Sequence, residues 1–126
     1  MKKIARTLVL LSPVLAMFGC GEKPVPASYS TDVKPILDKY CVRCHSEGGE
    51  GSKASGFQMI SYESLMKGTK FGPVITPGDG FSSVLVMLME GRADPSISMP
   101  HDDGVAPTQA EIDLVKVWID EGAENN

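Results

Sequence analysis

The sequence predicts a small, mainly α-helical domain in which three to four short helices are joined by long loops. Two segments, residues 33–40 and 112–119, place apolar side chains three and four positions apart, which is the spacing of an amphipathic helix. The 126 residues include 13 glycines and nine prolines, and no alternation of strand and helix patterns is seen. A chain of this size forms one domain with a modest core.

The first 19 residues have the features of a bacterial export signal. A basic start precedes an apolar run from Leu8 to Phe18, and this run of about eleven residues is shorter than the roughly 20 that span a bilayer. Cleavage before Cys20 resembles lipoprotein processing, in which the cysteine is lipidated and becomes the new N-terminus. We therefore predict a lipoprotein signal peptide at residues 1–19, a lipidated Cys20 with a flexible tether at residues 20–29, and a domain at residues 30–126.

The charge of the chain is acidic. Loss of the predicted signal removes three of the 12 basic residues and none of the 16 acidic ones. The remaining 107 residues carry nine basic and 16 acidic side chains, hence a net charge of −7. Such a surface does not attract nucleic acid or anionic lipid headgroups. It suits a protein partner with a basic docking surface.

Cys41 and Cys44 are the two cysteines that remain once Cys20 is assigned to lipid, and they lie in the segment CVRCHSEGGEG. Outside the cytoplasm, unassigned thiols tend to oxidise, so we expect the two cysteines to be used together. Three chemistries use a C-x-x-C pair. A thioredoxin-like dithiol follows a strand in a βαβ unit, which the sequence does not indicate. A zinc site needs four ligands, and beside His45 the chain offers only His101 as a further histidine.

The third chemistry is covalent attachment of haem, for which C-x-x-C-H is the signature. Cysteines at positions i and i+3 lie on one face of a helical turn. The sulfurs of Cys41 and Cys44 can therefore form thioethers with the two vinyl groups along one edge of the porphyrin. His45 follows directly and can offer a neutral imidazole nitrogen to the iron. We predict one covalent haem c on Cys41 and Cys44, with His45 as an axial ligand.

A helix is predicted to deliver this motif. Ser30 or Thr31 fits its N-cap, and Pro35 fits its first turn. Its apolar residues have helical spacing and are expected to pack in the core; they are Val33, Ile36, Leu37 and Tyr40.

Two further helices are predicted in the second half. The last one begins with a capping box of Thr108 and Glu111 and ends at Gly122, and it buries an apolar face. An earlier, short buried helix has Asp79 as its predicted N-cap. The run Val84–Met89 within it also fits a strand by periodicity alone.

A helix that enters a haem motif, a final helix and loops between them are the plan of the small c-type cytochromes. The chain resembles the class I monohaem cytochromes c, and specifically the planctomycete-type cytochrome c domains. The matching segments follow the family's order between about Val33 and Ala123; they are ILDKYCVRCH, YESLMKG, GPVITPGD, SSVLVML, SMP and EIDLVKVWIDEGA. The resemblance implies the small cytochrome c fold, with loops wrapped around one covalent haem.

The resemblance also implies that the methionine of the MP pair, here Met99, is the second axial ligand of the iron. A soft thioether on a loop that can fold over the haem meets this need. Met59 and Met66 fit as wall residues, and the methionines of Val84–Met89 fit core packing. His101 departs from the family's pattern, and ligation of the iron by His101 is an alternative.

These features predict a one-electron carrier and not an enzyme. The iron, held by His45 and Met99, would cycle between iron(II) and iron(III). The alternative is a haem-based small-ligand sensor or a peroxidase-like enzyme with a labile sixth ligand, for which Arg92 and His101 are the candidate distal residues. The carrier is expected on the periplasmic side of the bacterial cell envelope, where Cys20 anchors it to a membrane and redox partner proteins exchange electrons with it.

Overall fold

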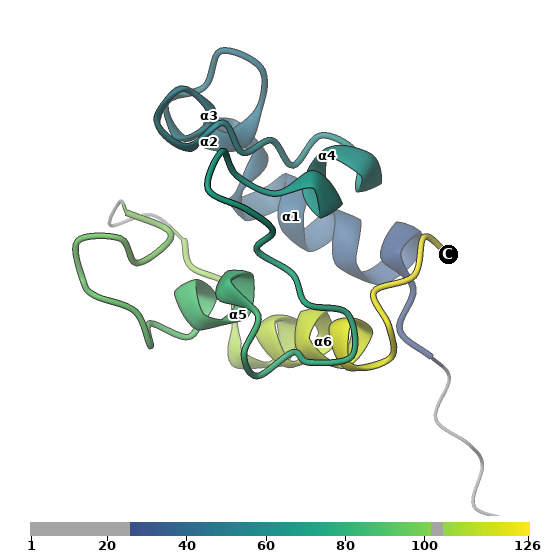
Figure 1. The fold of residues 1–126 in the computed structure, drawn as a ribbon. Helices are drawn as coiled ribbons and strands as arrows, with labels where there is room; N and C mark the ends of the chain where they lie inside the picture. Colours follow the sequence, from purple (N-terminus) through teal and green to yellow (C-terminus); the bar gives the residue numbers. More distant parts are fainter. Residues whose placement is uncertain (1–25, 102–104) are drawn as a thin grey trace, which may run out of the picture.

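The computed structural model describes residues 26–101 and 105–126, and their regular secondary structure is helical (Figure 1). In chain order the elements are the π-helical turn η1 (Tyr29–Val33) and the helices α1 (Lys34–Tyr40), α2 (Val42–His45), α3 (Glu50–Ser55), α4 (Tyr62–Lys67), α5 (Val84–Met89) and α6 (Gln109–Asp120). Within the described residues there is no β-strand. The predicted mainly α-helical class is confirmed, and the structure adds α3 and α4 where loops were expected.

The first helical segment begins two or three residues earlier than the sequence predicts. Its N-cap is Ser28, whose hydroxyl accepts a hydrogen bond from the N–H of Thr31, so neither Ser30 nor Thr31 is the cap. The N–H of Ser28 in turn donates to the carboxylate of Asp32 at 2.8 Å, which gives Ser28 the reciprocal contact that fixes a helix start. Pro35 lies in the first turn of α1, as predicted.

Helix α6 begins and ends as the sequence predicts. Thr108 and Glu111 form the capping box, in which each side chain accepts from the other residue's N–H. At the far end Gly122 has a φ of 112°, which a glycine adopts without strain. This conformation lets the N–H of Ala123 bond to the carbonyl of Trp118 at 2.9 Å, so that the last carbonyls of the helix are satisfied.

Helix α5 is a helix and not a strand, but its predicted N-cap is wrong. The residue at the N-cap position is Ser83, not Asp79. Asp79 instead closes the preceding turn, because its carboxylate accepts from the N–H of Ser82 at 2.9 Å and its carbonyl accepts from the Ser83 hydroxyl at 2.7 Å. Ser83 is only 1% exposed, and its hydroxyl also accepts from the N–H of Thr76. The turn and the helix are therefore tied together.

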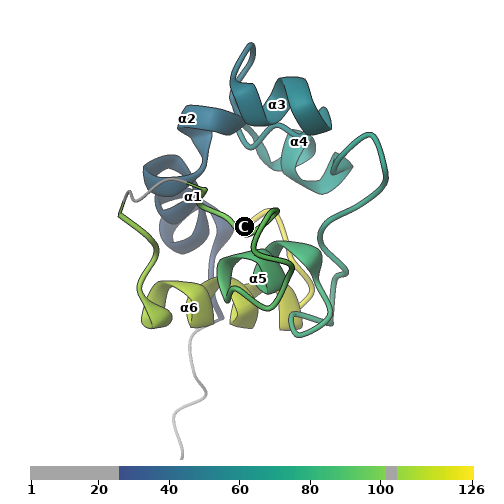
Figure 2. The ribbon, with the colours of Figure 1, turned by 90° about the vertical axis from the view of Figure 1, so that its left-hand side faces the viewer.

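The elements form two groups in both views of the ribbon (Figures 1 and 2). Helices α2, α3 and α4 lie on one side, and α5 and α6 lie on the other.

The two ends of the described domain meet, since the N–H of Tyr29 donates to the side chain of Asn126 at 2.7 Å. Tyr29 also packs against the rings of Tyr62 and Trp118, with centroid distances of 5.3 and 5.6 Å.

The core follows from the predicted apolar faces. Residues of η1 and α1 pack with those of α5, α6 and the loops; the buried members are Ala27, Tyr29, Val33, Ile36, Leu37, Phe57, Met59, Leu65, Val74, Ile75, Leu85, Val86, Ile112, Val115, Trp118, Ile119 and Ala123. Tyr40 packs against this core and is partly buried. In the part of the chain that the structure describes, none of the helices has the length and apolar character needed to span a bilayer.

Candidate functional site

A cavity of about 400 Å³ lies between the two groups of helices. Its lining includes Cys41, Cys44 and His45, together with residues of helix α5 and the segment 99–101. The structure thus brings the two cysteines, His45 and Met99 to the walls of a single cavity. Cys20, the predicted lipidation site, lies outside the described residues, as does the predicted signal.

The Cys41–His45 segment forms one helical turn at the end of α1. The N–H of Cys41 bonds to the carbonyl of Leu37 at 2.9 Å, and the carbonyl of Cys41 accepts from the N–H groups of Cys44 and His45 at 3.1 and 2.9 Å. Both cysteines are half-buried free thiols. Burial, with a smaller contribution from Cys44, raises the pKa of the Cys41 thiol to about 11. The neutral thiol of Cys41 is therefore the stable form at neutral pH.

His45 is held in the tautomer that a metal ligand needs. Its side chain is buried, with 8% of the residue exposed, and its Nδ1 lies 3.1 Å from the carbonyl oxygen of Phe57. Because a carbonyl oxygen only accepts, Nδ1 carries the hydrogen, and the lone pair is left on Nε2. The Phe57 ring packs edge-on against the imidazole, with the centroids 5.3 Å apart. A backbone carbonyl on the second ring nitrogen is the usual support of a metal-bound histidine, so these residues fit a haem iron.

Two glycines after the motif let the chain pack directly against it. A Cβ on Gly51 would lie 2.7 Å from Cε1 and 2.8 Å from Nε2 of His45, and a Cβ on Gly49 would clash with the carbonyl oxygen of Cys44. Such distances are well below van der Waals contact, so a Cβ at either position would force its neighbours to move. Gly51 is therefore a residue of the site that spacing alone does not identify. The signal that marks it is the group of three glycines, at positions 48, 49 and 51, that begins three residues after His45.

The walls that face the motif are mainly apolar. Helix α5 contributes Val84, Leu85, Leu88 and Met89, and the loop before it contributes Val74. Met59 lines the cavity as predicted, whereas Met66 packs against the core instead. Met89, which was expected to be a core residue only, also lines the cavity. An apolar wall of this kind suits a flat hydrophobic ring and excludes water from it.

Met99 is carried by a segment that begins with a hydrogen-bonded turn at Asp94. The Asp94 carboxylate accepts from the hydroxyl and the N–H of Ser96 at 2.6 and 2.9 Å, and its carbonyl accepts from the N–H of Ile97 at 2.9 Å. The bonds from Ser96 hold the pKa of Asp94 below its ordinary value. Met99 is half-buried in the cavity wall. His101 also lines the cavity and is exposed on its outer side.

Arg92, a candidate for peroxidase-like chemistry, is engaged outside the cavity. Its guanidinium donates to the carbonyl of Phe81 at 2.7 Å, lies 4.5 Å from the centre of the Phe81 ring and pairs with Glu90. It does not contribute to the wall, in contrast to His101. Of the two predicted distal residues, the cavity thus holds one.

The comparison with known families agrees with this geometry. The family described as planctomycete cytochrome C matches residues 41–103, which is half of the chain and runs from the first cysteine of the motif to beyond Met99. The chain belongs to this family. As a planctomycete cytochrome c with a mainly helical fold, it is assigned to haem-based electron transfer, and haem c is the implied cofactor. Searches of curated proteins and of solved structures gave no match.

Proposed function

We propose that this cytochrome carries single electrons through one haem c, attached by thioethers to Cys41 and Cys44 and ligated by His45 and Met99. The observation that supports this most directly is the hydrogen bond of His45 Nδ1 to the carbonyl of Phe57 at 3.1 Å, because it leaves Nε2 as the donor atom. When bound, the haem supplies the iron(II)/iron(III) couple. The protein supplies the ligands and their orientation.

The apolar wall sets the environment in which the electron moves. Side chains of α5 and Val74 line the cavity and would keep water away from a bound haem. A dry site disfavours the state with the greater net charge. A thioether ligand such as Met99 also stabilises iron(II) relative to a second imidazole. Both effects raise the reduction potential of the haem. The proposed carrier therefore accepts electrons from donors whose potential is lower than this raised value.

Two protein ligands would leave the iron without a position for a substrate, which favours a carrier over an enzyme or a sensor of small ligands. Ligation by His101 is the alternative for the sixth position, and its support is that His101 lines the same cavity. It would keep the electron-carrier function but lower the potential. The two arrangements therefore differ in a measurable quantity.

The location and the partners are further parts of this proposal. The export signal and Cys20 favour a lipid anchor to a membrane on the periplasmic side of the bacterial cell envelope. A predicted net charge of −7 for residues 20–126 favours redox partner proteins with a basic docking surface.

One set of spectra tests the haem and its ligands. In the wild type, the haem should stay on the chain through extraction with acidified acetone, and the Cys41→Ser/Cys44→Ser variant should lose it. The oxidised wild type should show the weak long-wavelength charge-transfer band of a sulfur ligand on iron, called here the sulfur-to-iron band. The reduced wild type should bind carbon monoxide poorly.

Met99→Ala should abolish that band and admit carbon monoxide, whereas the matched variants Met59→Ala and His101→Ala should keep it. Loss of the band in Met59→Ala alone would assign the ligand to Met59. A wild type without the band that becomes five-coordinate in His101→Ala would assign it to His101. Full extraction of haem from the wild type would overturn the covalent attachment.

A further inference from the structure

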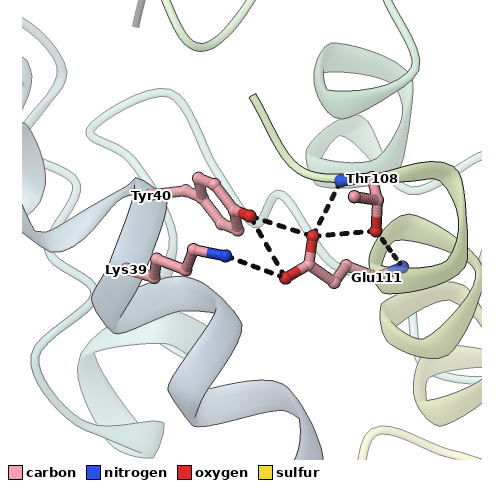
Figure 3. Close-up of polar contacts among 4 residues, drawn as sticks. All are labelled: Lys39, Tyr40, Thr108 and Glu111. Carbon is pink, nitrogen blue, oxygen red and sulfur yellow. Dashed lines mark hydrogen bonds and ion pairs between the residues drawn. The ribbon is translucent and has the colours of Figure 1, made fainter. Parts of the chain in front are cut away.

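The carboxylate of Glu111 bonds directly to a residue of the cavity wall (Figure 3). That residue is Tyr40, which lines the cavity and whose hydroxyl lies 3.1 and 3.0 Å from the two carboxylate oxygens. From its own helix, the carboxylate accepts from the N–H and the hydroxyl of Thr108 at 2.7 and 2.9 Å. Thr108 follows Pro107, which also lines the cavity. A wall residue and the neighbour of another therefore hold the carboxylate in place.

The ammonium of Lys39 is the opposite charge of this network. It lies 3.4 Å from one oxygen of Glu111 and 4.5 Å from the centre of the Tyr40 ring. The two charged side chains differ in their access to water, since that of Lys39 is 58% exposed and that of Glu111 is 25% exposed. Water and salt screen an exposed charge more strongly than a partly buried one. The negative charge of Glu111 therefore acts on its surroundings with less screening than the positive charge of Lys39.

Glu111 carries its negative charge at neutral pH. The hydrogen bonds from Thr108, followed by those from Tyr40 and Lys39, lower the pKa of Glu111 to about 2. The path from the carboxylate to the cavity runs through Tyr40, and protein atoms screen a charge less than bulk water does. A group bound in the cavity is thus exposed to the field of a fixed, ionised carboxylate.

We infer that Glu111 is an electrostatic determinant of the reduction potential of the proposed carrier: its carboxylate favours the oxidised haem and lowers the potential, and Lys39 opposes this effect. Reduction of iron(III) to iron(II) takes one electron from the donor and removes one unit of positive charge from the cavity. A fixed negative charge beside the wall therefore stabilises the oxidised state. This inference rests on the proposed function, because it requires a haem in this cavity.

A redox titration of the holoprotein against a reference dye of known potential measures the effect. Glu111→Gln keeps the shape of the side chain and removes its charge, so it should raise the potential. The electron-exchange equilibrium with the dye should shift toward iron(II) roughly twofold to tenfold, as for one partly screened unit charge. Lys39→Gln should lower the potential and shift the equilibrium the other way by a smaller factor. The double variant should lie between the two single variants.

Two matched variants separate charge from structure. Asp113→Asn removes the same charge from the same helix, but Asp113 is exposed and bonds to Gln109, so its potential should stay close to that of the wild type. Tyr40→Phe removes the hydrogen bond and keeps both charges, so it should move the potential less than Glu111→Gln does. Trp118, the single tryptophan, is 1% exposed, and its fluorescence reports any loss of global stability separately.

The signs of the shifts distinguish an effect of charge from a loss of structure. Glu111→Gln and Lys39→Gln both break the same ion pair, so a purely structural role would move the potential in the same direction in both variants. Shifts of the same sign would therefore overturn the inference. An unchanged potential in Glu111→Gln, or an equal shift in Asp113→Asn, would overturn it as well.

The same measurements separate the inference from the proposed function. A wild type that holds its haem and shows the sulfur-to-iron band, but whose potential does not respond to Glu111→Gln, would overturn the inference alone. A wild type without that band whose two charge variants shift in opposite directions would overturn Met99 ligation and support the role of Glu111. A wild type that binds no haem would overturn both.

Discussion

Replacement of Gly51 by alanine tests whether helix α3 shapes the environment of His45. Gly51 is the second residue of α3, in a helical conformation that any residue adopts. Its new Cβ would lie 2.7 to 3.0 Å from three atoms of the His45 ring. The imidazole also contacts the Phe57 carbonyl and the Phe57 ring, so a movement away from the new Cβ strains those contacts.

Two effects of opposite sign compete in this variant. Without the contact to His45, alanine in place of glycine would stabilise a helix by at most about 1 kcal/mol. Overpacking of a well-filled site costs typically about 1–3 kcal/mol. Because the clash involves a ring that also contacts Phe57, we expect the cost of overpacking to exceed the gain in helix propensity. The free energy of unfolding should fall by about 0–3 kcal/mol.

The measurements are chemical denaturation followed by Trp118 fluorescence, and the reduction potential with the absorbance spectrum of the holoprotein. Gly51→Ala should lower the stability and shift the potential, since a displaced imidazole loses its bond to Phe57 and becomes a weaker donor. Gly48→Ala is the matched control. Its Cβ meets nothing within 4 Å, but its φ of 75° strains alanine, so it should lose about 1–2 kcal/mol of stability without a change in potential.

A specific result would refute this reasoning. Gly51→Ala could instead be more stable than the wild type and have the same reduction potential. The gain in helix propensity would then exceed the cost of overpacking, and α3 would not constrain His45. If Gly48→Ala shifts the potential as much as Gly51→Ala does, the effect belongs to the loop as a whole.

Three further predictions follow from single side chains. Because the pKa of Glu111 is lowered from 4.5 to about 2, its stabilising effect is complete above pH 4.5 and is lost as the pH falls toward 2; thermal unfolding of wild type and Glu111→Gln should therefore converge over this range, and a constant difference would contradict it. Met99→His should keep six coordination bonds but lower the midpoint potential substantially in a redox titration, whereas an unchanged potential would speak against Met99 as a ligand. Cys20→Ser should release the protein from the membrane fraction, since the acyl chains supply the anchor; a wild type that is fully soluble, with Cys20 unmodified by mass spectrometry, would exclude lipidation.

The parts of the structure that depend on neighbouring residues could be predicted from the sequence. The capping box of Thr108 and Glu111 and the helix end at Gly122 depend on positions within one turn. The C-x-x-C-H spacing likewise specifies a single helical turn. Where several polar residues compete for a cap, the same local rules fail, because the choice depends on the turn that precedes the helix. Ser28 and Ser83 are the N-caps for this reason, although their neighbours have equal propensity.

Contacts through space could not be predicted in this way. The distance of Gly51 from His45 depends on the path of the loop between α2 and α3, which no spacing rule specifies. The bond between Tyr40 and Glu111 joins residues 71 positions apart. Met89 lines the cavity because of how α5 is rotated on α6, and an apolar run without polar residues gives no indication of that rotation.

The two sides of the haem cavity therefore differ in how they are encoded. His45 is supported by Gly51 and Phe57, which follow it within one short segment, so its support forms with the local structure. Met99 is carried on a segment whose own turn at Asp94 is local, but its place in the same cavity as the cysteines depends on the packing of elements that are far apart in the sequence. Contacts of large sequence separation need the complete tertiary structure, whereas local contacts survive partial unfolding. We therefore expect that mild denaturant removes the Met99 ligand before the His45 ligand, so that the sulfur-to-iron band is lost while the histidine-ligated haem spectrum and part of the helical circular dichroism remain.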